Sequence, residues 1–530
     1  MSLLQVTDLT FCYEGSFDNI FENVSFNVDT DWKLGFIGRN GKGKTTFLNL
    51  LLGKYEYNGS IVTDRHFDYF PYVISERDRD LTVIELCDRW KNGVEEWRTV
   101  SEVTSLKADP EILYRPVGTL SHGELTKAML AVLFSGENEF LLIDEPTNHL
   151  DMTGRKAVGD YLAKKKGFIL VSHDRVLLDK VCDHMLVLNR SSIEVISGNF
   201  SVWQENKERK DAFAKAENEK HIREIGKLKA SADRAKRWAD KNESTKIGFD
   251  PIKEPERNIS TRSYIGAKTK KMQSRVKNFE KRIDRQIAEK EGLLNDIENV
   301  EELKLAPLIH HKKTLVQGRD LSISYEGPGE ESKKEVIKGL TFQAEQGDIL
   351  FLNGENGCGK SSLIKAILSS AGYEDEEKSA AAGEKGREET DRGEQSRMEI
   401  SGVLTTASGL KISYVSQNTS FLKGTLKDFA KERGLDYSRF LTLLRKLDMS
   451  RLQFEKNMED YSEGQKKKVL IAASLIQPAH LYIWDEPLNY IDVFSRIQIE
   501  KLIEMYRPTM ILVEHDEYFR NKLATGILDL

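Results

Sequence analysis

Two stretches of the sequence decide the fold: GRNGKGKT at Gly38–Thr45 and GENGCGKS at Gly354–Ser361. Both match the pattern GxxxxGK[ST], follow a run of β-forming residues and open an apolar helical pattern, which is the context of a phosphate-binding loop. The glycines let backbone N–H groups curl around a phosphate at a helix N-terminus. One match can arise by chance, but two in one chain predict a pair of phosphate-binding domains.

Further duplicated segments follow each loop. FLLIDEPTNHLD at Phe140–Asp151 returns as LYIWDEPLNYID at Leu481–Asp492, and SHD at 172–174 returns as EHD at 514–516. The loop lysines are 316 residues apart and the Asp-Glu pairs 341 apart, so the second copy has gained about 25 residues between them. The polar segment 374–397 accounts for this insert. We expect a surface loop without a catalytic part, because it has too little apolar surface to offset its ordering entropy.

Composition excludes several classes of protein. The chain of 530 residues is 39% hydrophobic and 31% charged, and no apolar run approaches the roughly 20 residues that cross a bilayer. Its N-terminus lacks the pattern of a secretory signal. The four cysteines are scattered, with no CxxC pair to hold zinc. These features predict a soluble cytoplasmic protein with reduced thiols and no membrane partner.

Positive charge is concentrated in one segment. Between Lys220 and Arg285 there are 20 Lys and Arg against 9 Asp and Glu, whereas the whole chain has a net charge of -6. Six apolar residues between Met272 and Leu294 recur at steps of three, four and seven, and Ile222, Ile225 and Leu228, with later alanines and Trp238, are expected to form the facing helix. We expect an antiparallel helical hairpin whose tip lies near 249–264. The excess of basic residues favours a polyanion partner over a mere spacer.

The duplicated motifs predict hydrolysis of a nucleoside triphosphate, with ATP and Mg²⁺ as the expected cofactors. Lys44 and Lys360 reach the β- and γ-phosphates. The hydroxyl and carboxylate ligands expected for magnesium are Thr45, Asp144, Ser361 and Asp485, with Gln417 added as a further ligand. Glu145 and Glu486 are placed to polarise the attacking water.

These residues resemble the ABC ATPase family, in which a signature motif of one cassette caps the γ-phosphate of ATP held by the other. LSHGE at Leu120–Glu124 and YSEGQ at Tyr461–Gln465 look like this signature, and His173 and His515 look like the switch histidine. Tyr13 and Tyr325 are candidates for stacking on adenine. The full set of residues expected to bind ATP is Tyr13, Gly38, Asn40, Gly41, Gly43, Lys44, Thr45, Thr46, Ser121, Gly123, Tyr325, Gly354, Asn356, Gly357, Gly359, Lys360, Ser361, Ser362, Gln417, Ser462 and Gly464.

The resemblance implies an α/β fold: two P-loop ABC-type nucleotide-binding domains in tandem, joined by a long α-helical hairpin linker. We expect the first domain at 1–204, the linker at 205–306 and the second domain at 307–530. The chain is expected to be monomeric, with its two cassettes forming an intramolecular dimer.

The sequence departs from the family pattern mainly in one composite site. Gln417 fits the Q-loop glutamine of the second cassette, but Tyr72 stands at this place in the first, and Glu463 replaces a signature glycine. In a head-to-tail dimer, both changes fall in the site that joins Lys44 to YSEGQ. A carboxylate near a triphosphate is unfavourable unless it points away or binds a cation. We therefore expect unequal sites, with the first turning over more slowly.

Three kinds of ABC protein compete: the energising subunit of a transporter, a DNA-repair ATPase and an ABC-F protein. A transporter subunit usually carries one cassette, and transport does not explain the basic hairpin. DNA-repair ATPases place coiled coils or zinc modules inside a cassette, and this sequence has no paired cysteines for zinc. Tandem cassettes, DEPTNHLD and the run GNFSVW at Gly198–Trp203 resemble ABC-F proteins over the whole chain. YSEGQKKKVLIA and the linker entry look like the Lsa-type antibiotic-resistance members, and neither a long arm within a cassette nor a C-terminal extension is expected.

This resemblance implies ribosome protection: binding to the tRNA exit site of the 70S ribosome, with the linker tip directed at the peptidyl transferase centre. Displacement of lincosamides, pleuromutilins and group A streptogramins, and release driven by hydrolysis, would follow. A translation factor without a resistance role is the alternative. No DNA partner is expected. The linker residues expected to meet 23S rRNA and P-site tRNA are Lys227, Lys229, Arg234, Lys236, Arg237, Lys241, Phe249, Tyr264, Lys268, Lys270, Lys271 and Arg275.

Overall fold

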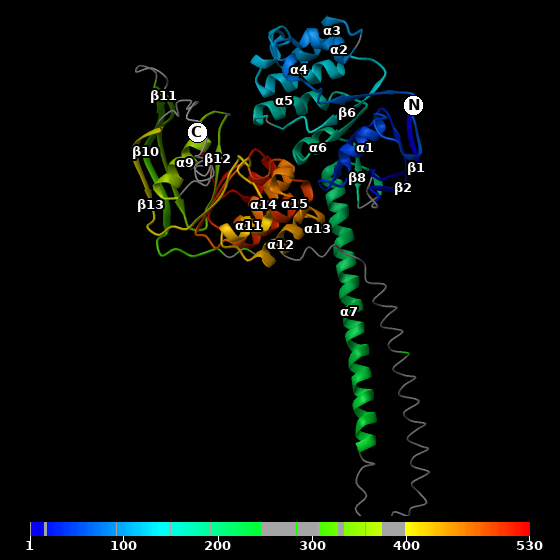
Figure 1. Cartoon of the computed structure of the whole chain (residues 1–530), viewed down its shortest axis with the longest axis vertical. Helices are drawn as coiled ribbons and strands as arrows, with labels where there is room; N and C mark the ends of the chain where they lie inside the picture. The colour runs from blue at the N-terminus through cyan, green and yellow to red at the C-terminus, as the bar shows by residue number, and fades with distance from the viewer. Residues whose placement is uncertain are drawn as a thin grey trace, which may run out of the picture. The chain divides into compact units, whose positions relative to one another are not determined.

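The computed structural model describes residues 2–14, 19–91, 93–148, 150–189, 192–244, 282, 305, 307–326, 333–355, 357–373 and 398–530. Two compact units make up the chain. One contains 1–203 together with 300–530, and the other contains 204–299. The first unit holds two α/β cassettes and the second belongs to the segment between them, as Figure 1 shows.

The first cassette is built on two sheets. A three-stranded antiparallel sheet has the order β2-β1-β4, and a six-stranded sheet has the order β5-β6-β7-β3-β8-β9, in which only the β8–β9 pair is antiparallel. Its strands are β1 (Leu3–Phe11), β2 (Phe21–Asp29), β3 (Lys33–Gly38), β4 (Asn58–Val62), β5 (His66–Phe70), β6 (Glu139–Asp144), β7 (Phe168–Val171), β8 (His184–Leu188) and β9 (Ile193–Ser197). Its helices are α1 (Lys44–Leu51), α2 (Val83–Trp90), α3 (Glu96–Ser105), α4 (His122–Phe134), α5 (Met152–Leu162) and α6 (Arg175–Val181).

The second cassette repeats this plan. Its antiparallel sheet has the order β11-β10-β13 and its five-stranded parallel sheet the order β14-β15-β16-β12-β17. Its strands are β10 (Thr314–Glu326), β11 (Lys333–Glu345), β12 (Ile349–Asn353), β13 (Met398–Thr406), β14 (Ile412–Val415), β15 (Leu481–Asp485), β16 (Met510–Val513) and β17 (Gly526–Asp529). Its helices are α9 (Lys360–Ser370), α11 (Leu426–Glu432), α12 (Tyr437–Lys446), α13 (Arg451–Phe454), α14 (Glu463–Ile476), α15 (Val493–Tyr506) and α16 (Glu517–Leu523).

Parallel strands explain where the functional side chains gather. β6 and β15 are apolar runs buried on both faces, as expected for strands inside a parallel sheet. Their carboxyl ends lie at the same sheet edge as those of β3 and β12, which lead into the P-loops. Ligands of such sheets bind at this edge. The predicted α/β fold with two tandem cassettes is confirmed.

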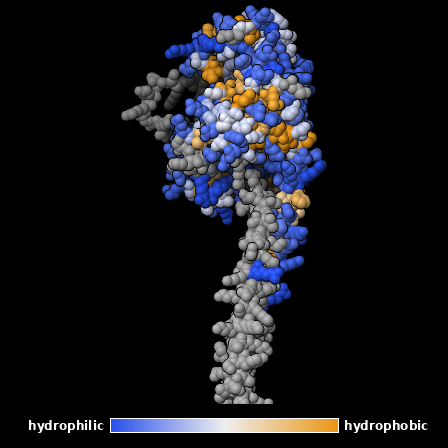
Figure 2. Space-filling model, turned by 90° about the vertical axis from the view of Figure 1, so that its right-hand side faces the viewer, coloured by the Kyte–Doolittle hydropathy of each residue, from blue (hydrophilic) through white to orange (hydrophobic). Residues whose placement is uncertain are grey.

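The segment after the first cassette begins as one long helix, α7 (Phe200–Ser244). Figure 2 shows mostly hydrophilic atoms on the side of α7 that is visible beside the grey atoms. The sequence predicts that Ile222 and Ile225 both lie on the face of this helix that packs against the second linker helix. This prediction is wrong for Ile222, which is 59% exposed, whereas Ile225 is buried. On an α-helix, residues three and six positions further on are rotated by about 60° and 120° from the first, so these side chains cover a broad arc and a side chain at its edge can face solvent. The second linker helix, the tip at 249–264 and the insert at 374–397 lie outside the described residues, as do the side chains of Ala232, Ala235 and Trp238.

Candidate ATP sites

Each P-loop wraps around the ammonium group of its lysine. Lys44 Nζ donates to the carbonyl oxygens of Gly38 at 2.7 Å and Arg39 at 3.2 Å, and to Asn40 Oδ1 at 3.2 Å. Lys360 Nζ repeats the backbone contacts, with the carbonyls of Gly354 at 2.8 Å and Glu355 at 2.9 Å. Both lysines are buried. A buried cation held at a helix N-terminus is a binding place for a phosphate.

Glycine is required where each loop enters its helix. Gly43 and Gly359 take φ values of 109° and 108°, which residues with a Cβ rarely adopt. A Cβ at Gly43 would lie 2.5 Å from Ile20 Cγ2, and one at Gly359 would lie 2.7 Å from Val336 Cγ1. Each loop therefore packs against the antiparallel sheet of its own cassette through one of these glycines. Gly41 and Gly357 also have positive φ, while Asn356 lies outside the described residues.

A hydroxyl and a carboxylate meet beside each P-loop. Thr45 Oγ1 donates to Asp144 Oδ2 at 3.3 Å, and Ser361 Oγ donates to Asp485 Oδ2 at 3.1 Å. The other oxygen of Asp485 is buried without a hydrogen-bond partner. Burial and the neighbouring Glu486 charge together raise the pKa of Asp485 to about 6. Hydroxyl and carboxylate oxygens are hard ligands that suit a magnesium ion. Phosphate oxygens of the nucleotide would complete its coordination.

The two candidate catalytic glutamates occupy the same backbone position but have different surroundings. Glu145 and Glu486 have φ values of 51° and 47°, a strained conformation that recurs in both cassettes. The switch histidines lie nearby, with His173 Nε2 3.4 Å from Glu145 Oε1 and His515 Nε2 3.8 Å from Glu486 Oε1. The structure thus brings the candidate glutamate and the candidate histidine of each cassette together.

Two side-chain amides donate to Glu486, whereas among the described residues the carboxylate of Glu145 accepts only from the backbone N–H of His173, at 3.4 Å. Gln417 Nε2 and Asn489 Nδ2 each donate to Glu486 Oε2 at 2.7 Å. Although burial acts to raise the pKa of Glu486, His515 and Gln417 outweigh it and leave that pKa below its usual value. In the first cassette, Oε1 of Glu145 is buried without a hydrogen-bond partner. Burial and the Asp144 charge raise the pKa of Glu145 to about 8.

The tyrosines expected near adenine occupy matching positions. The hydroxyl of Tyr13 lies 2.8 Å from Thr46 Oγ1, and Tyr325 donates to Ser362 Oγ at 2.9 Å. Tyr13 is 40% exposed and its ring stands edge-on to Phe11 and Tyr55. Each hydroxyl therefore ties its ring beside the first turn of a P-loop helix, at matching positions in the two cassettes.

The missing Q-loop glutamine is a real difference between the cassettes. Phe70 pairs with Ile143 in the first sheet, and Val415 pairs with Trp484 in the second. Since Ile143 and Trp484 both precede the Asp-Glu pair, Tyr72 occupies the position of Gln417. Its ring stacks on Trp90 with a centroid distance of 4.8 Å, and its hydroxyl donates to Asp68 Oδ2 at 2.7 Å. Tyr72 thus supplies no amide to Glu145.

Sequence reasoning missed the residue that reaches the magnesium carboxylate from this strand. Tyr69, three residues earlier, donates from its hydroxyl to Asp144 Oδ2 at 3.1 Å. Burial and the Asp144 charge raise the pKa of Tyr69, so the phenol remains protonated. Tyr69 pairs with Leu142, two residues before Asp144, so strand alternation places its side chain on the same face of the sheet as that aspartate, whereas Tyr72 follows the end of β5.

The signature serines cap helices in both cassettes. Ser121 begins α4 and accepts from Glu124 N, and Ser462 begins α14 and accepts from Gln465 N. Glu463 of the second signature points back to its own cassette, where Thr419 Oγ1 donates to it at 2.5 Å and Lys466 Nζ lies 3.2 Å away. The carboxylate that the sequence places near a triphosphate is therefore engaged elsewhere.

The first P-loop meets the signature region of the second cassette. Asn40 Nδ2 donates to the carbonyl oxygen of Tyr490 at 2.6 Å. A Cβ at Gly464 would lie 2.5 Å from that oxygen and 3.3 Å from Asn40 Nδ2. Among the residues with assigned positions, a Cβ at Gly123 would meet only Leu150 of its own cassette. The head-to-tail arrangement is thus visible at the first composite site.

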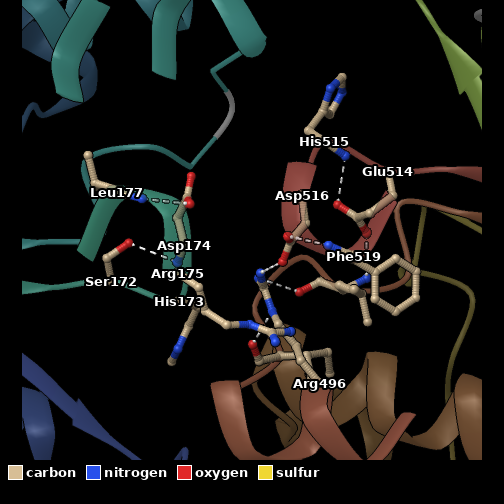
Figure 3. A network of polar contacts seen from close by, with 12 residues as sticks. Ser172, His173, Asp174, Arg175, Leu177, Arg496, Glu514, His515, Asp516 and Phe519 are labelled. Atoms are coloured by element: carbon tan, nitrogen blue, oxygen red, sulfur yellow. Dashed lines mark hydrogen bonds and ion pairs between the residues drawn. The ribbon is translucent and has the colours of Figure 1, made fainter. Parts of the chain in front are cut away.

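The segments after the switch histidines are tied to the helices that follow the Asp-Glu motifs. Figure 3 shows Arg496 of α15 reaching Asp516, at 3.1 Å, while Asp516 caps α16 by accepting from Phe519 N. The first cassette has the same pair in looser form, with Arg155 Nη1 3.6 Å from Asp174. Both arginines also donate to a backbone carbonyl of their own loop, at Leu150 and Ile491. These pairs hold each histidine segment in place.

Basic residues of the linker lie on α7 as far as the structure describes them. Lys227, Lys229, Arg234 and Arg237 are exposed. Arg234 Nε donates to the carbonyl oxygen of Ala230 at 3.2 Å. The side chains of Lys236 and Lys241 lie outside the described residues, and so do Phe249, Tyr264, Lys268, Lys270, Lys271 and Arg275.

Two P-loop sheets with duplicated acid pairs, histidines and signature serines define a tandem ATP-binding-cassette ATPase. A family model described as "ABC transporter" matches residues 21–148 and 337–489. The chain belongs to this ABC family, as a tandem-cassette ATPase of its ABC-F branch. In the part of the chain with assigned positions, no helix is long and apolar enough to cross a membrane.

Similar proteins extend over nearly the whole chain. The "ribosome protection protein VmlR" of Bacillus subtilis is 24% identical over 535 residues, which are 99% of this chain and 86% of that protein. The "ATP-binding protein Uup" of Buchnera aphidicola is 28% identical, over 99% of this chain and 80% of that protein. The "erythromycin resistance ATP-binding protein MsrA" of Staphylococcus epidermidis is 25% identical, over 92% of this chain and 89% of that protein.

A solved structure shares the fold. The structure of the archaeal ribosome recycling factor aABCE1 in complex with the stalk protein aP1 has a TM-score of 0.56 and 18% identity, covering 98% of this chain and 87% of that one. At this identity the likeness shows the fold alone.

Proposed function

We propose that this chain is an ATP-dependent ribosome-binding protein of the cytoplasm that confers antibiotic resistance by protecting the target. With ATP bound, it occupies the tRNA exit site of the 70S ribosome and directs the linker tip toward the peptidyl transferase centre. Lincosamides, pleuromutilins and group A streptogramins are displaced, and hydrolysis releases the protein. The similarity to a ribosome protection protein over 99% of the chain is the observation that carries this proposal.

ATP binding and hydrolysis at the two sites control when the protein binds the ribosome and when it leaves. Lys44 and Lys360 hold the β- and γ-phosphates, and the serine, threonine and aspartate oxygens beside them hold Mg²⁺, which stabilises charge on the transferring phosphoryl group. Glu145 and Glu486 orient water and His173 and His515 contact the γ-phosphate. The signature serines of the opposite cassette complete each site, so that ATP binding closes the cassettes and hydrolysis opens them.

Gln417, which the sequence predicts as a magnesium ligand, contacts the candidate base Glu486. Its Nε2 donates to Glu486 Oε2, which leaves the amide oxygen for the ion or for water. We assign Gln417 to positioning the base Glu486, with any contact to Mg²⁺ as a second role.

The linker supplies affinity for RNA. Lys227, Lys229, Arg234 and Arg237 are exposed along α7, and lysine and arginine side chains neutralise phosphates with little dependence on sequence. The aromatic residues Phe249 and Tyr264 near the expected tip are suited to stacking on bases. This arrangement predicts binding to 23S rRNA and P-site tRNA that weakens with rising salt.

The test is a trapped-binding assay with the variant Glu145→Gln/Glu486→Gln, which binds ATP without hydrolysing it. We expect this variant to co-sediment with 70S ribosomes only when MgATP is present. Replacing Lys227 and Arg234 by Gln should lower the salt slope of binding by about 1 to 2. Lys164→Gln/Lys166→Gln removes the same charge from an exposed part of the first cassette and is the matched control. If the trapped variant does not bind ribosomes, the proposal is wrong.

A translation-factor role is the second candidate, favoured by the similarity to Uup, whose name carries no resistance function. Drug susceptibility separates the two. Cells that express the chain should tolerate higher concentrations of the three drug classes, and deletion of 249–264 should abolish this tolerance while ATP-trapped binding remains. Unchanged susceptibility together with trapped binding would identify a translation factor.

A further inference from the structure

An ion pair joins the first P-loop to the helical region of the second cassette. Arg39 Nη1 lies 3.1 Å from Asp448 Oδ1, and the side chains are only 19% and 21% exposed. Arg39 is the second residue of its P-loop, and its guanidinium also lies 5.7 Å from the ring centroid of Phe494 in the second cassette. The pair therefore sits beside the contact between Asn40 and Tyr490 that marks the first composite site.

The internal duplication identifies the partners of this pair in the other composite site. Glu355 is the second residue of the second P-loop, as Arg39 is of the first. Lys107 corresponds to Asp448, because each follows a helix, α3 or α12, and each lies 14 residues before its signature serine, from 107 to 121 and from 448 to 462. The two also share a left-handed backbone, with φ values of 55° and 64°.

Their local hydrogen bonds agree with this correspondence. Lys107 N donates to the carbonyl oxygen of Thr104 at 3.0 Å, and Asp448 N donates to that of Arg445 at 2.9 Å. In each loop the backbone N–H of the following residue donates to a carbonyl oxygen of the preceding helix, from Ala108 to Val103 and from Met449 to Leu444. The two loops are thus copies that differ in the charge they carry.

Both charges have been exchanged between the copies. A cation on the first P-loop faces an anion on the second cassette, and the second P-loop carries an anion where the first cassette offers a cation. If only one of the two positions had changed sign, like charges would face each other at the second site. The joint exchange keeps the pairing attractive at both.

We propose that Lys107 and Glu355 pair across the cassettes when the second composite site closes on ATP, as Arg39 and Asp448 pair at the first. In this structure Lys107 is 75% exposed and lies 3.9 Å from Asp160 of its own cassette, and Glu355 is exposed. Closure transfers Lys107 from Asp160 to Glu355. The two ion pairs, which have opposite polarity, then join the cassettes at the edges of the two ATP sites. The pair of Lys107 and Glu355 is called the clasp below. This inference rests on the head-to-tail closure in the proposed function and does not depend on the ribosome.

A charge-reversal cycle in the full chain tests the clasp. In the trapping background Glu145→Gln/Glu486→Gln, hydrogen–deuterium exchange of the peptide with Leu120–Glu124 reports closure of the second site as MgATP is added. Lys107→Glu and Glu355→Lys should each raise the MgATP concentration at half-protection by about three- to tenfold, because each places like charges together. The variant with both changes should return to within about twofold of the background. Lys166→Glu, which makes the same charge change at another exposed lysine of this cassette, should have no effect.

The outcomes separate the clasp from closure itself. If the trapping background shows protection but the two reversals add to each other instead of compensating, the clasp is overturned while head-to-tail closure stands. If Leu120–Glu124 gains no protection in the background, the head-to-tail closure in the proposed function is wrong. If Lys166→Glu shifts the midpoint as much as Lys107→Glu, the effect reflects net charge and the clasp is again overturned.

Discussion

The guanidinium of Arg175 and the carboxylate of Glu500 form a double hydrogen bond between the two cassettes. Nη1 donates to Oε2 at 3.2 Å and Nη2 donates to Oε1, and the side chains are only 2% and 1% exposed. The guanidinium also lies over the ring of Tyr518, 4.6 Å from its centroid. Since Arg175 follows His173 by two residues, the switch segment of the first cassette is anchored to helix α15 of the second.

Removal of this arginine should destabilise the packing of the cassettes. Arg175→Met leaves the buried Glu500 with Lys522 Nζ at 3.7 Å as its remaining cationic partner. Breaking one side of a buried ion pair costs about 3–5 kcal/mol. A lower urea midpoint in equilibrium unfolding is the expected result. Lys522→Met removes a more exposed partner and should cost about 1 kcal/mol or less.

The double variant Arg175→Met/Glu500→Leu distinguishes an uncompensated charge from lost packing. Because an apolar pair leaves no buried charge, most of the stability should return. A double variant as unstable as Arg175→Met alone would show that the loss comes from packing around the guanidinium and not from the carboxylate.

The different surroundings of the two glutamates predict unequal hydrolysis. Gln417 and Asn489 orient Glu486, whereas Glu145 has a buried oxygen without a hydrogen-bond partner. Glu486→Gln should therefore lower steady-state ATP turnover by about tenfold or more, and Glu145→Gln by about twofold or less. Equal losses in the two variants would contradict the assignment of slow turnover to the first site.

Tyr72 should matter for stability more than for catalysis. Its hydroxyl is bound to Asp68 and its ring is stacked on Trp90, so Tyr72→Phe should leave ATP turnover within about twofold while costing about 1 kcal/mol of stability. Tyr69→Phe is the matched change three residues earlier, in β5. Because Tyr69 donates to Asp144, that variant should raise the Mg²⁺ concentration needed for half-maximal turnover. The reverse pattern would place Tyr72 in the site.

Much of the fold and site follows from local sequence signals. A P-loop needs glycine at positions such as Gly43 and Gly359, where the backbone is left-handed and a Cβ would strike the neighbouring sheet. The acid pairs end apolar strands, and the parallel sheet then brings Asp144 and Asp485 to Thr45 and Ser361. Such constraints act over a few residues and are therefore readable from the chain.

The remaining features depend on contacts between segments far apart in the sequence. That Glu463 turns to Thr419, or that Arg175 meets Glu500, depends on which side chains lie within reach after packing. For these features the sequence offers one indication, which is the internal duplication. Positions that differ between the two copies indicate where the two cassettes have different roles. The burial of Ile225 beside an exposed Ile222 likewise follows from the exact phase of a helix, which a loose heptad pattern does not fix.

The base of α7 should be coupled energetically to the second cassette. Trp203, in the first turn of the helix, is 4% exposed and meets Phe494 edge-on with a centroid distance of 5.6 Å. Trp203→Ala should cost about 3–5 kcal/mol of stability through the cavity it leaves, whereas Val202→Ala, at a position 44% exposed, should cost about 0.5 kcal/mol or less. In a double-mutant cycle with Phe494→Ala, we expect a coupling of about 0.5–1.5 kcal/mol from the aromatic pair, measured by urea unfolding. Strictly additive losses would mean that Trp203 is held by Phe200 and the first cassette alone, and that Phe494 does not sense the start of the linker helix.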